Sequence, residues 1–280
     1  MDDQVTQDTQ TRRIAIALAI ALALGAGGWW FWHRSASAKP AAGVAEAAPA
    51  TVAAAAASQA APAIKYPLTT ATESGPVAAP ALSDPDATAR EGLASLFGEP
   101  ALAEWLIPEQ LLRRLVATAD NLPRSTRSES LRPVRAPATP FAVRREMLEA
   151  STGTERITLS DENFARYDSA VAVLAKTDMG AAAKLYRQLY PLLQKAYEDL
   201  GYPDRYLNDR VVDTIDHLLA TPEPQQPLLL EQPKVLYRYA DGDLESRSTG
   251  QKLLLRMGVK HTMTIKQKLR EFRAQIANKE

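Results

Sequence analysis

The fold is decided by the stretch from Leu185 to Gly201, which reads LYRQLYPLLQKAYEDLG. Apolar residues recur in it every three or four positions, at 185, 189, 192, 196 and 200. This spacing places them on one face of an α-helix. Gly201 stands just after the pattern, where glycine commonly ends a helix. Pro191 lies inside it and lacks the N–H of a helical hydrogen bond, so we expect a kink or a break there.

Helical patterns continue on both sides of this stretch. Upstream, Ser160 is a suitable N-cap for a helix with apolar residues at 164, 167, 171 and 174. Downstream, Pro203 and Asp204 suit the first turn of a helix that stops before Pro222. The sequence therefore predicts at least three consecutive helices in the middle of the chain.

The C-terminal part carries two more helical patterns. Ser248 and Gln251 form a capping box that opens a helix over 250–257, and Gly258 is placed to end it. A final helix comes next, with apolar residues on one face at 265, 269, 272 and 276. The helical character thus extends almost to the C-terminus.

Strand signals are few. Residues 141–145 and 155–159 can pair across a turn at Ser151-Thr152-Gly153, and residues 235–239 alternate in polarity. Residues 123–140, rich in Pro, Arg and Ser, resemble a long surface loop. We therefore predict a mainly α, multi-helix globular domain over 84–280, with a small β-hairpin or short sheet.

The N-terminal part predicts a membrane anchor. Residues 14–32 contain no charged side chain, and at about 1.5 Å per residue they span roughly 28 Å, close to the hydrocarbon thickness of a bilayer. Trp29, Trp30 and Trp32 at the downstream end suit a membrane–water interface. We expect a cytoplasmic tail over 1–13, one transmembrane helix over 14–32 and an Ala/Pro-rich disordered linker over 33–83.

These features predict a single-pass protein of the cell inner membrane, with its C-terminal domain in the periplasm. The alternative is a signal peptide that is cleaved after Ala38, because Ala36-Ser37-Ala38 has the small-x-small pattern of a cleavage site. Both interpretations export the domain from the cytoplasm.

Composition excludes several kinds of chemistry. The absence of cysteine removes thiol nucleophiles, disulfides and thiolate metal sites. The 33 basic and 33 acidic residues cancel, which argues against a nucleic-acid binder. His217 and Asp213 share a helix face, but a metal site needs three or four ligands, so we predict no metal and no cofactor. Catalytic motifs of metalloproteases and α/β-hydrolases are missing, which favours a non-enzymatic protein.

Two groups of side chains are candidate binding residues. The first is a possible sugar- or peptide-binding groove, in which arginines flank tyrosines; the alternative is that the tyrosines form the rim of a core. Its members are Tyr186, Tyr190, Tyr197, Arg187 and Arg205. The second is a basic patch on the final helix; the alternative is that these cations dock on the acidic segment 161–245. Its members are Lys260, Lys266, Arg270 and Arg273.

Several segments together resemble the bacterial domain of unknown function 3014 family. They are Asp120-Asn121-Leu122-Pro123-Arg124, the run 185–197, Leu200-Gly201-Tyr202-Pro203, residues 215–219 and residues 250–258. The resemblance covers nearly all of 84–280. It implies a bacterial envelope protein with one N-terminal membrane helix, and it brings no activity, cofactor or catalytic residue.

The expected function is that of a membrane-tethered interaction or scaffold domain, which binds an envelope protein or an anionic envelope polymer. Two alternatives stay open: an envelope hydrolase with an unrecognised acidic site, and a binder of anionic lipid surfaces through residues 252–279. The sequence leaves the oligomeric state unspecified.

The predicted topology has a direct test. A reporter enzyme that folds only in the periplasm, fused after Glu280, should be active, because the apolar segment 14–32 exports the remainder of the chain. A reporter that works only in the cytosol should be silent at the same position. The reverse pattern of activities would contradict the topology.

Overall fold

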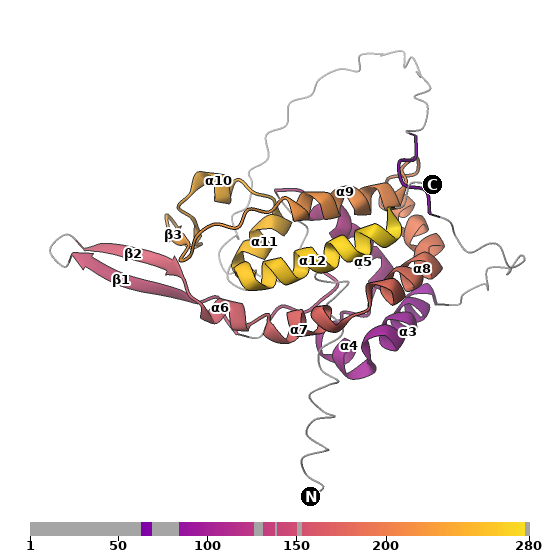
Figure 1. The fold of residues 1–280 in the computed structure, drawn as a ribbon, viewed down its shortest axis with the longest axis horizontal. Coiled ribbons are helices and arrows are strands. Elements are labelled where there is room, and N and C mark those ends of the chain that lie inside the picture. The colour runs from indigo at the N-terminus through magenta and orange to yellow at the C-terminus, as the bar shows by residue number, and fades with distance from the viewer. Residues whose placement is uncertain (1–62, 69–83, 126–130, 138, 150–152, 278–280) are drawn as a thin grey trace, which may run out of the picture.

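The computed structural model describes residues 63–68, 84–125, 131–137, 139–149 and 153–277 (Figure 1). Within these ranges no helix is long and apolar enough to cross a membrane. The predicted tail over 1–13 and the predicted transmembrane helix over 14–32 lie outside the described residues.

The described chain is mainly helical, as predicted. The first helices are α3 (Pro85–Phe97), α4 (Glu99–Trp105) and α5 (Leu111–Asn121). Two short helices, α6 (Glu162–Ala165) and α7 (Asp168–Lys176), precede the long helices α8 (Met179–Asp199) and α9 (Leu207–Leu219). The C-terminal helices are α10 (Gly242–Glu245), α11 (Thr249–Met257) and α12 (Val259–Ile276).

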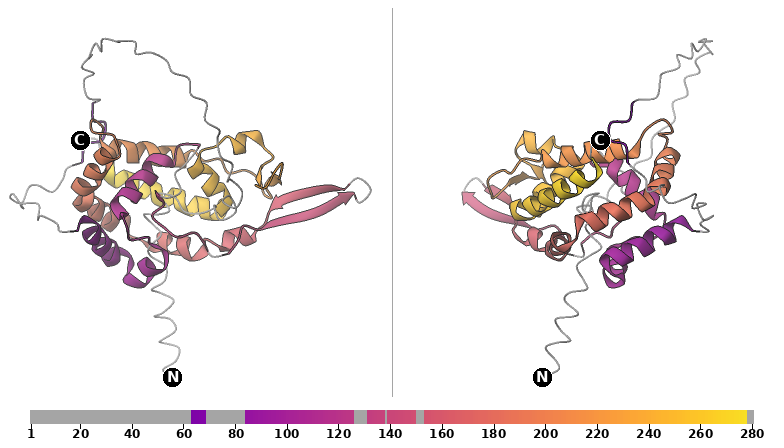
Figure 2. Two further views of the ribbon diagram at one scale, coloured as in Figure 1. Left: turned by 180° about the vertical axis from the view of Figure 1, so that it is seen from behind. Right: turned by 45° about the vertical axis from the view of Figure 1, so that its right-hand side comes forward.

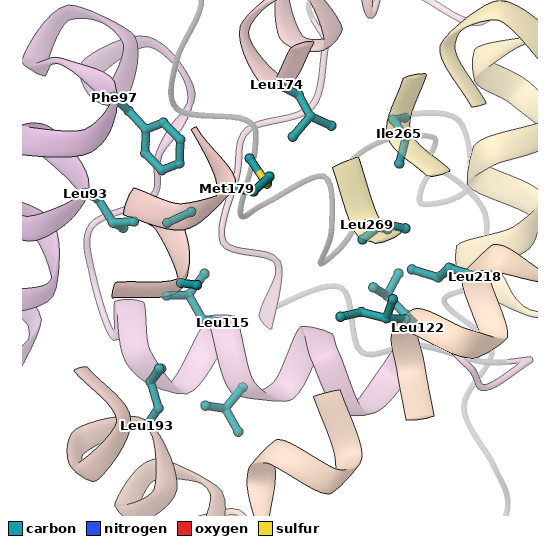
Figure 3. Packing of buried hydrophobic residues seen from close by; sticks show 14 of the residues in the cluster. Leu93, Phe97, Leu115, Leu122, Leu174, Met179, Leu193, Leu218, Ile265 and Leu269 are labelled. Atoms are coloured by element: carbon teal, nitrogen blue, oxygen red, sulfur yellow. The ribbon is translucent and has the colours of Figure 1, made fainter. Parts of the chain in front are cut away.

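Helix α12 runs through the middle of the helical body and packs against α7, α8, α9 and α11 (Figure 1). Helix α5 also packs against α8 and α9, and α3 packs against α5 in turn. Side chains from these separate helices converge in one hydrophobic core, as Figure 3 shows for Leu93, Leu115, Leu174 and Ile265. This central core joins the N-terminal and C-terminal helices into one body.

A small antiparallel sheet lies at one end of the helices. Its strands are β1 (Val143–Glu149), β2 (Thr154–Leu159), β3 (Leu229–Glu231) and β4 (Arg238–Tyr239), in the order β1-β2-β3-β4. The predicted hairpin is confirmed, with Val143 opposite Leu159 and Arg145 opposite Ile157. It projects from the helical body in all three ribbon views (Figures 1 and 2). The sequence missed β3, whose three residues are too few to show an alternating pattern.

The predicted start and the predicted end of α11 are both confirmed. The Ser248 hydroxyl accepts a hydrogen bond from the Gln251 N–H at 3.2 Å and so caps α11. Gly258 ends α11 with φ at 83°, in the region that favours glycine. An added Cβ there would also lie 2.9 Å from the Phe164 ring, so both the turn and the close approach require glycine.

Three helix predictions are wrong in detail. The upstream pattern forms two helices, α6 and α7, and buried Asn163 in α6 binds the Ala142 backbone through both its carbonyl oxygen and its amide. Of the kink or break expected at Pro191, the break does not occur, since α8 continues through this proline; Pro191 is exposed, so water can reach the carbonyl left without a helical partner. Helix α9 begins at Leu207 instead of Pro203, and before it the Arg205 N–H closes a turn by donating to the Tyr202 carbonyl at 3.3 Å.

The predicted surface loop over 123–140 is also only partly correct. Within it Val134 is fully buried and forms an isolated β-bridge with Leu106. The Arg135 guanidinium donates to the Ala103 and Glu104 carbonyls at 2.7 and 3.0 Å. This part of the segment therefore closes the end of α4.

Gly250 allows α11 to approach the end of α5. Its N–H donates to the Leu122 carbonyl at 2.9 Å, and an added Cβ would lie 2.6 Å from a Leu218 methyl group and 3.1 Å from that carbonyl. Gly250→Ala should therefore lower the free energy of unfolding by about 1–3 kcal/mol, measured by urea denaturation. Gly242→Ala is the matched control, because nothing lies within 4 Å of its added Cβ. Equal stability of the two variants would refute the tight contact.

Candidate functional site

The most specific polar site of the described chain holds a short segment from the N-terminal side. Residues 63–68, which we call the docked segment, lie against the start of α9 and the end of α12. The contacting side chains, which we call the clamp, are Tyr206, Asn208, Asp209 and Arg273. These six residues lie within the predicted linker over 33–83, and the clamp binds three of their backbone N–H groups and one carbonyl.

Asp209 binds two consecutive backbone N–H groups of the docked segment. One carboxylate oxygen accepts from the Lys65 N–H at 2.9 Å and the other from the Tyr66 N–H at 2.8 Å. Hydrogen bonds to a charged acceptor are among the stronger ones in proteins. Asp209 lies in the first turn of α9, where the helix dipole stabilises a negative charge. This carboxylate therefore fixes the main chain of the docked segment.

Asn208 joins the docked segment to the core. Its amide nitrogen donates to the Tyr66 carbonyl at 2.9 Å and to the Ile276 carbonyl at 3.0 Å. Its side-chain oxygen accepts from the Tyr186 hydroxyl at 3.2 Å. Asn208 is fully buried, so this complete set of partners offsets the cost of removing its amide from water.

The docked segment makes further contacts through one more backbone N–H group and through its side chains. The Tyr206 hydroxyl accepts from the Leu68 N–H at 2.9 Å, and the Arg273 guanidinium lies 5.9 Å from the centre of the Tyr66 ring. Tyr66 and Leu68 are half-buried against the central core. The exposed Lys65 ammonium lies 3.8 Å from Asp213. The clamp thus binds backbone, aromatic and apolar groups at once.

Two of the predicted tyrosines support the clamp from inside the protein. The rings of Tyr186 and Tyr190 meet edge to face at 5.7 Å, and Tyr186 meets Phe272 in the same way. The Tyr190 hydroxyl accepts from the Asn208 N–H at 3.2 Å. Burial raises the pKa of both Tyr186 and Tyr190, so their hydroxyls keep their protons. They are core residues whose polar tips position Asn208.

Tyr197 belongs to a different cluster. Its ring stacks on Tyr202 at 4.7 Å, and the Tyr202 hydroxyl donates to buried Asp120 at 3.0 Å. The same carboxylate pairs with Arg210 at 3.0 Å and with Arg124. Asp120 is therefore an ion-paired carboxylate that ties the end of α5 to α9.

The predicted basic residues do not form one patch. Lys266 is buried, and its ammonium donates to the Thr221 carbonyl and to Glu223, both at 2.6 Å. This ammonium lowers the pKa of Glu223. Arg273 pairs with Asp216 at 2.8 Å, which raises the pKa of the guanidinium. Lys266 and Arg273 therefore pair with residues of the acidic segment 161–245, which was the alternative to a basic patch.

The remaining candidates lie apart from the clamp contacts. Arg187 donates to the Gln275 carbonyl near the end of α12, and Arg205 is exposed in the turn before α9. Lys260 and Arg270 are exposed on α12. Only Arg273 among the predicted cations contacts the docked segment.

Metal-binding groups do not gather in the parts that the structure describes, where no cluster of three or more such side chains occurs. His217 and Asp213, which share a helix face, bind different partners. The His217 imidazole binds the Ser248 hydroxyl at 2.8 Å, whereas Asp213 faces Lys65. Burial and the charges of Arg210 and Arg247 lower the pKa of His217.

Most of the helical domain matches a known protein family. The model of the family described as "Protein of unknown function (DUF3014)" matches residues 111–273, more than half of the chain. The chain belongs to this family. The matched range contains the whole clamp, but it does not reach the docked segment. No curated protein and no solved structure matches the chain.

Asp209 provides a test of the clamp. Asp209→Ala removes the acceptor of two backbone N–H groups, so residues 63–68 should detach more often and trypsin should cut after Lys65 about tenfold faster. Intact-mass spectrometry of the full-length chain during limited digestion measures this rate.

The matched control is Asp204→Ala, an exposed carboxylate in the turn before α9. It should leave cleavage after Lys65 unchanged. Equal cleavage rates in both variants would show that Asp209 does not hold the segment.

Proposed function

We propose that this protein is a membrane-tethered, non-enzymatic interaction domain of the bacterial cell envelope, and that its clamp binds a short peptide segment. The observation that carries the proposal is the paired acceptance of the Lys65 and Tyr66 N–H groups by one carboxylate, Asp209. Such an arrangement recognises a polypeptide main chain. The docked segment is then the ligand that the protein carries in its own chain.

The division of contacts supports a peptide as the ligand class. Four polar contacts go to main-chain atoms of the docked segment: three N–H groups and the Tyr66 carbonyl. Side-chain contacts select an aromatic residue beneath Arg273 and an apolar one two positions later. Asp209 and Asp213 favour a basic residue before the aromatic one. A partner segment should therefore resemble basic-aromatic-x-apolar.

Because the docked segment belongs to the same chain as the clamp, it competes with a partner segment for the clamp. Residues 69–83 link the segment to α3, and a covalent link of this length gives an effective concentration of about the millimolar range. To displace the docked segment, a partner segment needs either a higher affinity for the clamp or a high local concentration of its own. Tethering at a membrane would supply the latter.

Location in the envelope rests on the sequence. The apolar segment 14–32, the Ala/Pro-rich segment after it and the family resemblance support a single-pass inner-membrane protein with a periplasmic domain. On this proposal the partner is a segment of another envelope protein. The hydrolase alternative has no specific observation in its favour, since the buried Asp120 is fully engaged with Arg210, Arg124 and Tyr202.

Competition between the two ligands gives the test. Tyr66→Ala combined with Leu68→Ala should release the docked segment in the full-length chain. A labelled peptide with the sequence of residues 63–68 should then bind at least about tenfold more tightly than to the unaltered chain, as measured by fluorescence anisotropy. Adding Asp209→Ala should abolish the gain, and adding Asp204→Ala should not. Absence of saturable binding to the released variant would refute a peptide-binding function.

A further inference from the structure

An apolar cavity of about 90 Å³ lies in the central core. Side chains from α3, α5, α7, α8, α9 and α12 line it, among them Leu115, Leu174, Leu193 and Ile265 (Figure 3). Protein interiors contain few voids larger than one water molecule, which needs roughly 10–15 Å³. The cavity is several times larger than that, so it is an unusual feature of an otherwise well-packed core.

Water is a poor occupant of this cavity. The wall is almost entirely apolar, and its hydroxyl groups already have partners in the protein. Thr214 donates to the Ala119 carbonyl at 3.0 Å, and Tyr186 donates to Asn208. A buried water normally needs two to four polar partners, so an apolar ligand suits the space better.

We place the opening of the cavity between α8 and α12, where most of its half-buried lining residues lie. The half-buried members of its lining lie mostly on these helices: Leu185 and Tyr186 on α8, and Lys268 and Phe272 on α12. Lys268 is the charged residue of the lining, and 15% of its side chain is exposed. Its ammonium donates to the Glu271 carboxylate at 2.9 Å and to the Thr177 carbonyl at 3.2 Å. The mouth thus carries a cation that already binds a carboxylate.

We propose that this cavity binds the end of an alkyl chain from an anionic amphiphile, with Lys268 holding the acidic head group. The head group would take the place of Glu271, whose side chain is 39% exposed and can turn to water. The volume is below the roughly 150 Å³ of a cavity that holds benzene, which favours the tip of a chain over a ring. A free fatty acid and a phospholipid both offer this chemistry.

Photo-crosslinking in the full-length chain, reconstituted in phospholipid nanodiscs, tests the proposal. The probes are a fatty acid with a diazirine near the chain end, the alcohol of the same length, and a phospholipid with the same labelled chain. Mass spectrometry should locate crosslinks on cavity residues such as Leu189 and Ile265. Labelling by the free acid alone assigns a free fatty acid as the ligand, and labelling by the phospholipid assigns a membrane lipid.

Two kinds of variant decide the outcome. Ala182→Leu, or Ala119→Val as a second filler, occupies the cavity and should lower cavity labelling about tenfold without lowering the melting temperature. Lys268→Met should lower labelling by the acid and leave labelling by the alcohol unchanged, whereas Lys234→Met, at an exposed distant lysine, should change neither. Labelling that misses the cavity residues, or that both fillers leave unchanged, overturns the proposal.

Discussion

Burial of one face of α12 is the interaction on which the described structure depends. Ile265, Leu269 and Ile276 are each at most 3% exposed and pack against the surrounding helices. Full burial of such side chains contributes about 1.5–3 kcal/mol each. The more exposed ion pair of the same helix, Arg273 with Asp216, contributes at most about 1 kcal/mol. Apolar burial therefore holds α12 in place, and the polar contacts fix its rotation and the position of its end.

The site depends on this placement. Because α12 ends beside the start of α9, the Ile276 carbonyl and Asn208 meet, and Asn208 turns its second N–H toward the docked segment. Arg273, near the end of α12, contacts both Asp216 on α9 and the Tyr66 ring. A clamp for a main chain is thus built from two helix ends, where backbone groups and polar side chains remain available.

Local signals predicted α8, α9, α11, α12 and the hairpin but not α3, α4, α5 or α10. Short-range chemistry decides the predicted elements; Ser248, for example, caps α11 within three residues of its own position. Where distant partners decide, prediction failed. Asn208 and Asp209 look like ordinary polar residues of a first helical turn, and their role depends on residues 63–68, more than 140 positions earlier. One feature of the sequence did point to the docked segment. Tyr66 is a large aromatic residue inside an alanine- and proline-rich segment, and such residues are uncommon in linkers that make no contacts.

Tyr186 connects the two proposed sites physically. Its ring forms part of the cavity wall, and its hydroxyl donates to Asn208, which holds the Tyr66 carbonyl. Because Asn208 is fully buried, it cannot exchange a lost partner for water without cost. The cavity wall and the clamp therefore share one hydrogen bond, between Tyr186 and Asn208.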